Sequence, residues 1–119
     1  MVKRVLVVDD SNLMRHSVVK RLSDAGHEVV GKAKDGLEAV ELYRELRPDI
    51  VTMDITMRGK DGITAAKEIL ALDPDARIIF YTLLDAAPQL SARLEQIERK
   101  KIVRKGDEED LLRAVESQA

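Results

Sequence analysis

In this chain of 119 residues, the side chains best suited to metal binding or to a reaction follow aliphatic runs. Two aspartates follow the first run, and single polar side chains follow three later runs: Asp9 and Asp10, Asp54, Thr82, and Lys105. Three carboxylates at one place repel one another, so they are stable together when a cation neutralises them. The chemistry to consider is therefore metal binding, with one carboxylate acting as a nucleophile.

The types of side chain favour a hard divalent cation. The chain has no cysteine, and its two histidines, His16 and His27, are isolated and are expected at the surface. Mg²⁺ suits a site with few carboxylates and room for waters and a phosphate. A carboxylate beside such an ion can form an acyl phosphate if cations and donors meet the charge on the phosphoryl oxygens. Lys105 supplies a mobile cation and Thr82 a hydroxyl.

Five aliphatic runs are predicted to be the strands that position these side chains: residues 5–8, 29–30, 50–53, 78–81 and 102–103. The first, third and fourth runs are continuously apolar, which is typical of strands covered by helices on both faces. The second and fifth runs are short, so they predict strands less clearly.

Segments with helical periodicity lie between and after these runs. Capping residues are expected to begin the first three helices: Ser11, Asp35 and Asp61. The fifth helix is expected to begin at Asp107, where four acidic residues favour a helix N-terminus. Glu38 completes a capping box in the second helix, and the fourth helix begins near Pro88. The apolar faces are predicted to contain Met14, Val18, Leu22 and Ala25; Val40, Tyr43 and Leu46; Ile63, Ala66 and Leu70; Leu90, Leu94 and Ile97; and Leu111, Leu112 and Val115.

Strict alternation of five strands and five helices, with right-handed crossovers, predicts a doubly wound α/β sandwich or a closed barrel. Five units are too few to close the usual barrel, so the open sandwich is favoured. In an open parallel sheet, ligands bind beyond the carboxyl ends of the strands. All five candidate side chains fall at those ends, and we expect them to meet at one edge of the sheet.

Composition narrows the range of functions. The net charge of −2 and the lack of a basic arm argue against autonomous binding to nucleic acid. No apolar run approaches the roughly 20 residues that cross a bilayer, and no signal peptide is readable, so a cytoplasmic location without membrane insertion is expected. A basic stretch at residues 93–105 precedes an acidic one at 107–110. It is interpreted either as a solvated face or as a docking surface for a partner.

The pattern resembles the receiver domain of two-component response regulators over residues 2–115. The resemblance is carried by the paired aspartates after the first strand, by the sequence VTMDITM with Asp54, by Thr82 and by Lys105. It implies a three-layer, flavodoxin-like (CheY-like) (βα)5 sandwich whose parallel five-stranded sheet has the order 2-1-3-4-5.

The resemblance also implies a reaction and a role for each residue. Asp54 would accept a phosphoryl group from the phosphohistidine of a histidine kinase in a Mg²⁺-dependent reaction. Asp10, Asp54 and the backbone carbonyl of Thr56 would bind Mg²⁺, whereas Asp9 would act mostly through a water. Lys105 would pair with the phosphoryl oxygens, and the Thr82 hydroxyl would turn inward to bind one of them.

A regulator of this kind is not an enzyme, since it catalyses only its own phosphotransfer and dephosphorylation. We expect a single receiver domain over residues 1–119 with no output domain, so its signal would be a phosphorylation-dependent contact with another protein. Chemotaxis and a phosphorelay are the two settings that the resemblance suggests. The face formed by the fourth helix, fifth strand and fifth helix is the expected docking surface for an unidentified target.

Four positions depart from the family's usual residues. Arg58 replaces a proline, which should make the loop after the phosphoacceptor less rigid and more basic. Gly106 replaces a cis-proline, which should constrain the neighbouring lysine less. Leu83 replaces a small residue and should restrict access for phosphodonors. Ile102 replaces the switch aromatic, so the response to phosphorylation should depend on movements of loops and helices.

Three other readings of the sequence remain open. A degenerate receiver would fold alike but serve as a phosphate-independent interaction module. A small phosphatase with an aspartyl nucleophile, of the haloacid dehalogenase type, would need an Asp-x-Asp pair, whereas this chain has adjacent aspartates followed by Ser11. A flavodoxin-like cofactor binder would need a phosphate loop rich in Ser, Thr and Gly instead of the acidic loop present here.

Overall fold

The computed structural model describes residues 2–83, 88–97 and 100–118. Within these ranges, five strands and five helices alternate: β1 (Arg4–Val8), α1 (Asn12–Asp24), β2 (Glu28–Ala33), α2 (Gly36–Leu46), β3 (Ile50–Met53), α3 (Gly62–Leu72), β4 (Ile78–Thr82), α4 (Pro88–Glu95), β5 (Lys100–Arg104) and α5 (Glu108–Ser117). All strand pairs are parallel, and the order in the sheet is β2-β1-β3-β4-β5. The predicted doubly wound fold and strand order are therefore confirmed.

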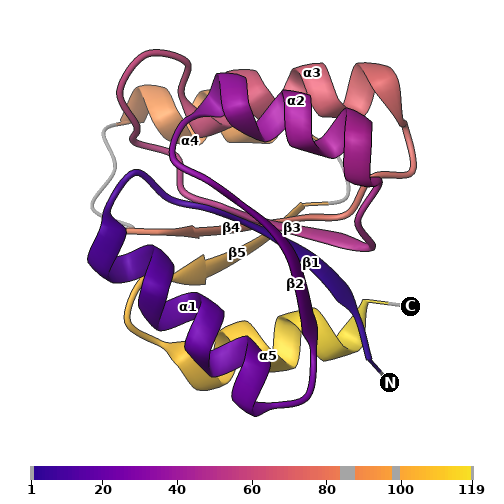
Figure 1. Ribbon diagram of the computed structural model, residues 1–119. Coiled ribbons are helices and arrows are strands. Elements are labelled where there is room, and N and C mark those ends of the chain that lie inside the picture. The colour runs from indigo at the N-terminus through magenta and orange to yellow at the C-terminus, as the bar shows by residue number, and fades with distance from the viewer. Residues whose placement is uncertain (1, 84–87, 98–99, 119) are drawn as a thin grey trace.

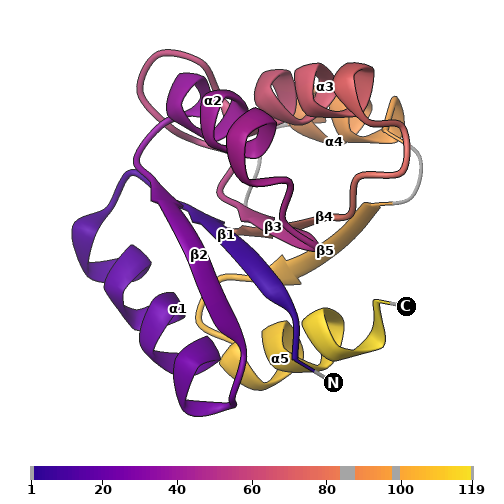
Figure 2. The same ribbon diagram turned by 45° about the vertical axis from the view of Figure 1, so that its right-hand side comes forward.

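The molecule has three layers, with the sheet between two layers of helices. In Figures 1 and 2, α2, α3 and α4 cover one face of the sheet, and α1 and α5 cover the other. Each face has its own apolar core: Phe80 and Ile63 belong to the first, and Ile79 and Leu111 to the second. The three central strands alternate side chains between these cores, which explains why their sequences are continuously apolar.

Side-chain caps fix where four of the described helices begin, and three of these caps, at Ser11, Asp35 and Asp61, were predicted. A side-chain oxygen accepts a hydrogen bond from the backbone N–H three residues later in four helices: Ser11 in α1 at 3.2 Å, Asp35 in α2 at 2.9 Å, Asp61 in α3 at 2.8 Å and Asp107 in α5 at 3.0 Å. In the second helix, the Glu38 carboxylate accepts the N–H of Lys34 at 3.2 Å, one residue before the cap. These caps place the preceding loops, and the site residues within them, at one edge of the sheet.

The structure corrects the predictions for Ala25 and His27. Ala25 does not lie on the buried face of α1, because the helix ends at Asp24 and Ala25 is its exposed C-cap. His27 is not a surface residue: it is only 6% exposed. Its Nδ1 accepts the backbone N–H of Lys3 at 3.1 Å, and its Nε2 lies 3.3 Å from a carboxylate oxygen of Glu116. Burial of the ring is therefore accompanied by polar partners at both nitrogens.

Two of the three apolar residues predicted around the fourth helix have described side chains. Leu94 and Ile97 are buried in the first core as predicted, although the helix itself ends at Glu95. The side chain of Leu90, which was predicted to lie on the same face, falls outside the described residues. Within the described ranges, no helix is both long and apolar enough to cross a membrane.

Candidate functional site

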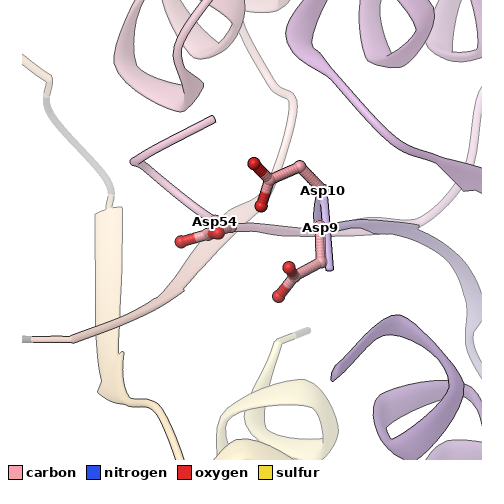
Figure 3. Close-up of side chains that lie close together, drawn as sticks. All are labelled: Asp9, Asp10 and Asp54. Atoms are coloured by element: carbon pink, nitrogen blue, oxygen red, sulfur yellow. The ribbon is translucent and has the colours of Figure 1, made fainter. Parts of the chain in front are cut away.

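Three carboxylates meet at the carboxyl edge of the sheet. Asp9 and Asp10 follow β1 and Asp54 follows β3, and these strands are neighbours with Val8 paired to Met53. One carboxylate oxygen from each aspartate lies within 4.8 Å of the others. Figure 3 shows the three side chains gathered at the ends of the two strands. The predicted acidic cluster is therefore confirmed.

The other two candidate residues lie at the same edge. Thr82 is the buried last residue of β4, and its carbonyl oxygen accepts the backbone N–H of Lys105 at 2.8 Å. The Lys105 ammonium lies 3.0 Å from Asp9 Oδ2 and 3.1 Å from Asp54 Oδ2. The fold thus brings together all five residues that the sequence singled out. The inward turn of the Thr82 hydroxyl stays a prediction.

The two ion pairs of Lys105 were not foreseen, because the resemblance assigned this lysine to the phosphoryl oxygens. Its ammonium neutralises two buried carboxylates, which are 2% exposed in Asp9 and 4% exposed in Asp54. Lys105 therefore supplies part of the positive charge that balances the carboxylates of the acidic cluster.

The carboxylates of the cluster differ in their hydrogen-bond and ion-pair partners. Asp9 uses both oxygens, since Oδ1 accepts the backbone N–H of Ser11 at 2.9 Å and Oδ2 pairs with Lys105. The hydrogen bond from the Ser11 N–H to Asp9, two residues earlier, forms an Asx-type turn. An aspartate followed two residues later by serine is a local signal that could have predicted this hydrogen bond. Asp10 is exposed, and no other residue in the described ranges bonds to its carboxylate. Asp10 is thus the carboxylate most free to take a cation.

The electrostatics of the site follow from burial and from these neighbours. Burial and the nearby carboxylates of Asp9 and Asp10 raise the pKa of Asp54, against the opposing effect of Lys105. Burial opposes the charged form of Lys105, but its bonds to Asp9 and Asp54 outweigh this and raise its pKa. The Lys105 ammonium therefore stays charged at neutral pH, and further positive charge near Asp54 would favour the ionised form of its carboxylate.

Close backbone contacts fix the segment that carries Asp54. A Cβ atom added at Gly62 would lie 2.0 Å from the carbonyl oxygen of Asp54, and one at Gly36 would lie 2.5 Å from that of Lys60. The N–H of Gly62 donates to Ile55 O at 2.8 Å, and that of Gly36 donates to Lys60 O at 3.2 Å. The starts of α3 and α2 are therefore joined to the loop after β3, although that loop lacks the usual proline.

The remaining departures can be placed as well. Gly106 has φ of 100°, a conformation that favours glycine, and its N–H donates to the Tyr81 hydroxyl at 2.8 Å. Ile102 is half-buried and packs against the first core. Arg58 and Leu83 are exposed. The predicted effects of all four residues on switching and access stay predictions.

Leu83 is expected to hinder small phosphodonors, since it directly follows Thr82 and 64% of its surface is exposed. Leu83→Ala should raise the rate of labelling by acetyl phosphate about threefold, equivalent to ~0.7 kcal/mol of activation free energy. The rate is measured by intact mass against time. Leu72→Ala, which truncates an exposed leucine at the far end of α3, is the control. Equal rates in the parent protein and Leu83→Ala would refute this role.

A bidentate ion pair connects α4 to α3, and sequence reasoning missed it. The Arg93 guanidinium donates to both carboxylate oxygens of Asp61, at 2.9 and 3.1 Å, and to the Thr64 hydroxyl at 3.2 Å. Asp61 is also the N-cap of α3. Partial burial opposes ionisation of Asp61, but the hydrogen bonds from Arg93 and Thr64 hold its pKa below the usual value. Arg93 and Asp61 are 32 positions apart, so no local sequence pattern predicts that they form an ion pair.

We expect Arg93→Gln to lower the free energy of unfolding by about 1 kcal/mol at pH 7. The pKa of Asp61 is lowered in the folded state, so this stabilisation is present above the unfolded pKa of about 3.9 and is lost as pH falls through the folded pKa. Urea unfolding of the parent protein and of Arg93→Gln, at several values from pH 7 to pH 3, measures this difference in the free energy of unfolding. Arg113→Gln, which removes an exposed pair with Asp110, should cost less than about 0.5 kcal/mol. A loss that is equally large at pH 3 would contradict the assignment.

The donor set of the acidic cluster fits a hard divalent cation. All three side chains are carboxylates, their oxygens converge, and Asp10 offers oxygens without protein partners in the described chain. Carboxylate oxygens without histidine or cysteine favour Mg²⁺ or Ca²⁺ over transition metals. The cluster is thus an acidic site of the type that holds Mg²⁺.

Comparison with known proteins agrees with the fold and the site. The sequence pattern of the family described as "Response regulator receiver domain" matches residues 5–116, nearly the whole chain. The chain therefore belongs to the response regulator receiver domain family. Membership identifies it as a regulatory protein rather than an enzyme, with Asp9, Asp10 and Asp54 forming the acidic pocket of a phosphorylated domain.

Two relatives and one solved structure illustrate the similarity. The chain is 57% identical over 77 residues to the chemotaxis protein CheY of Thermotoga maritima. This aligned stretch covers 65% of this chain and 64% of that protein's length. It is 42% identical to Protein CcdB of Bacillus subtilis over 94% of this chain and 93% of that protein. A chain in the crystal structure of the CheX–CheY–BeF3–Mg²⁺ complex of Borrelia burgdorferi superposes with a TM-score of 0.84 and 34% identity, covering 96% of this chain and 87% of that chain.

Proposed function

We propose that Asp54 is the phosphoacceptor of this receiver and takes its phosphoryl group from the phosphohistidine of a histidine kinase. The observation that carries the proposal is the convergence of Asp54 with two further carboxylates and an ammonium group at one edge of the sheet. Asp54 lies within 4.8 Å of both other carboxylates and 3.1 Å from the Lys105 ammonium. Family membership supports the same reaction.

We further propose that Mg²⁺ is the cofactor, held by Asp10, Asp54 and the backbone carbonyl of Thr56. Mg²⁺ supplies positive charge that neutralises the carboxylates and the phosphoryl oxygens. The hydrogen bond and the ion pair of Asp9 support an indirect role, since both of its carboxylate oxygens are occupied within the protein. The similar structure from Borrelia burgdorferi contains Mg²⁺, which supports the choice of ion.

The other two residues would act on the phosphoryl group after transfer. Lys105 already contacts Asp54, so a small shift of its ammonium from the carboxylates to the phosphoryl oxygens would keep the positive charge in place. Thr82, buried at the end of β4, would donate its hydroxyl to another of these oxygens. Movement of these two residues would couple phosphorylation to β4 and β5.

The proposed output is a protein contact at the face formed by α4, β5 and α5, made in the cytoplasm. Lys101 and Arg104 are exposed on β5, which supports a basic docking surface there. Arg93 and Lys100 from the same basic stretch have protein partners, in Asp61 and the Ile97 carbonyl respectively. The basic stretch is therefore partly structural, and Arg99 lies outside the described residues.

The experiment that tests this function is incubation with acetyl phosphate and Mg²⁺, followed by measurement of the intact mass. We expect a gain of one phosphoryl group, lost in Asp54→Asn and lost when a chelator removes Mg²⁺. Absence of a gain in the parent protein, together with normal Mg²⁺ affinity, would contradict phosphorylation and favour a degenerate receiver that acts without phosphate.

A further inference from the structure

A cavity of about 600 Å³ opens beside the acidic site, lined by Asp10, Ser11, Lys34, Asp35 and Arg58. These residues come from the segments that follow β1, β2 and β3, so the cavity lies at the same edge of the sheet as the three carboxylates. Its volume is within the range of small-molecule sites. Asp10 belongs both to this cavity and to the acidic cluster, which makes the two contiguous.

The cavity has two exposed cationic side chains that the reaction does not use. Lys34 lies between β2 and α2, and Arg58 lies between β3 and α3. Neither side chain forms an ion pair or a hydrogen bond with another residue in the described ranges. Asp35, also in the lining, caps α2 through the Glu38 N–H at 2.9 Å. Without a metal ion the lining carries two positive and two negative groups, so it has no net preference for an anion.

A divalent cation on Asp10 changes this balance. Once the Asp10 charge is neutralised, Lys34 and Arg58 face only the carboxylate of Asp35, and the lining becomes net positive. Attraction of anions by the cavity would therefore appear when the acidic site is loaded with Mg²⁺.

We propose that Lys34 and Arg58 form a subsite that recognises a carboxylate on small acyl phosphate donors, beyond the phosphoryl group that is transferred. The inference rests on the proposed function, because it concerns the same phosphoacceptor, Asp54, and adds a preference among small donors to transfer from a histidine kinase. It also gives a role to Arg58, which stands where the family usually has proline.

The reaction requires no further reactant. A carboxylate oxygen of Asp54 forms a bond to phosphorus, the bond from phosphorus to the acyl oxygen of the donor breaks, and the acyl group leaves as a carboxylate with the electron pair. The remainder of the donor extends toward the solvent side, since Lys105 and the buried Asp9 fill the inner side. Asp10 marks the open side, where Lys34 and Arg58 lie.

The test compares two acyl phosphates that differ by one carboxylate: acetyl phosphate and succinyl phosphate. At saturating Mg²⁺, the second-order labelling rate is measured for the parent protein and for Lys34→Gln/Arg58→Gln. We expect the ratio of the succinyl to the acetyl rate to fall about fivefold in the double variant, with the acetyl rate changed less than about twofold. Arg77→Gln/Lys101→Gln removes two exposed charges that do not line the cavity and should keep the parent ratio.

A binding measurement provides a readout that does not depend on transfer. Phosphonoacetate and methylphosphonate carry a non-transferable phosphorus group with and without a carboxylate. NMR titration of the Mg²⁺-loaded protein should show tighter binding of phosphonoacetate, with shifts at residues 34 and 58, and the double variant should lose this preference. The preference should also disappear when Mg²⁺ is removed.

Equal labelling ratios in the parent and the double variant, or equal affinities for the two phosphonates, would overturn the subsite. Such results would leave the proposed function intact, provided that acetyl phosphate still labels Asp54. If neither acyl phosphate labels the protein, the proposed function fails, and the phosphonate titration still decides whether the subsite exists.

Discussion

Lys105→Met is expected to raise the affinity for Mg²⁺ about tenfold while slowing labelling by acetyl phosphate at least about tenfold at saturating Mg²⁺. The ammonium lies 3.0 Å from Asp9 and 3.1 Å from Asp54, so it competes with a metal ion for the charge of the same carboxylates. Removing it leaves the acidic cluster with more uncompensated charge, which a divalent cation then neutralises. The transferred phosphoryl group, however, loses a positive partner.

The two effects have opposite signs, which makes the prediction specific. Mg²⁺ affinity is measured by titration and the labelling rate by intact mass. Lys101→Met is the matched control, since Lys101 is exposed on the same strand and does not contact the cluster. Unchanged or weaker Mg²⁺ binding in Lys105→Met would show that the lysine does not compete with the metal.

Asp10→Asn is expected to weaken Mg²⁺ binding about 100-fold, whereas Asp9→Asn should weaken it about tenfold or less. Both variants remove one charge, so the difference isolates direct coordination. Asp10 is exposed and its carboxylate has no protein partner in the described chain, whereas Asp9 is buried and uses both oxygens within the protein. Asp9→Asn also frees Lys105 from one of its two partners.

Titration of both variants with Mg²⁺ checks this order. Asp35→Asn is the control, because Asp35 is a nearby carboxylate outside the cluster and asparagine retains its capping function. Equal affinities in Asp9→Asn and Asp10→Asn would refute the assignment of distinct roles to the two adjacent aspartates.

The central strands were predictable because burial on both faces demands continuous apolar sequence. The two edge strands were predicted too short: residues 29–30 became β2 (Glu28–Ala33), and 102–103 became β5 (Lys100–Arg104). An edge strand pairs on one side only, so it tolerates polar residues such as Lys32 and Lys101 that protect it from further pairing. Because these lysines interrupt the aliphatic runs, the apolar pattern predicted only part of each edge strand.

The site was predictable to the extent that it depends on strand ends. Parallel strands deliver the residues that follow them to one edge, so Asp9, Asp10 and Asp54 could be placed together from the sequence. Contacts that depend on side-chain packing could not be predicted from the sequence. The bonds from Lys105 to Asp9, from Arg93 to Asp61 and around His27 join distant positions and depend on rotamers that no local pattern encodes.

Identification of the phosphorylated residue tests the central claim most directly. The protein is labelled with acetyl phosphate and Mg²⁺, the acyl phosphate is reduced with borohydride, and the position of the resulting homoserine is found by peptide mass spectrometry. We predict homoserine at position 54 and none at positions 9 and 10. Homoserine at position 9 or 10, or its absence from position 54 in a labelled sample, would contradict Asp54 as the phosphoacceptor.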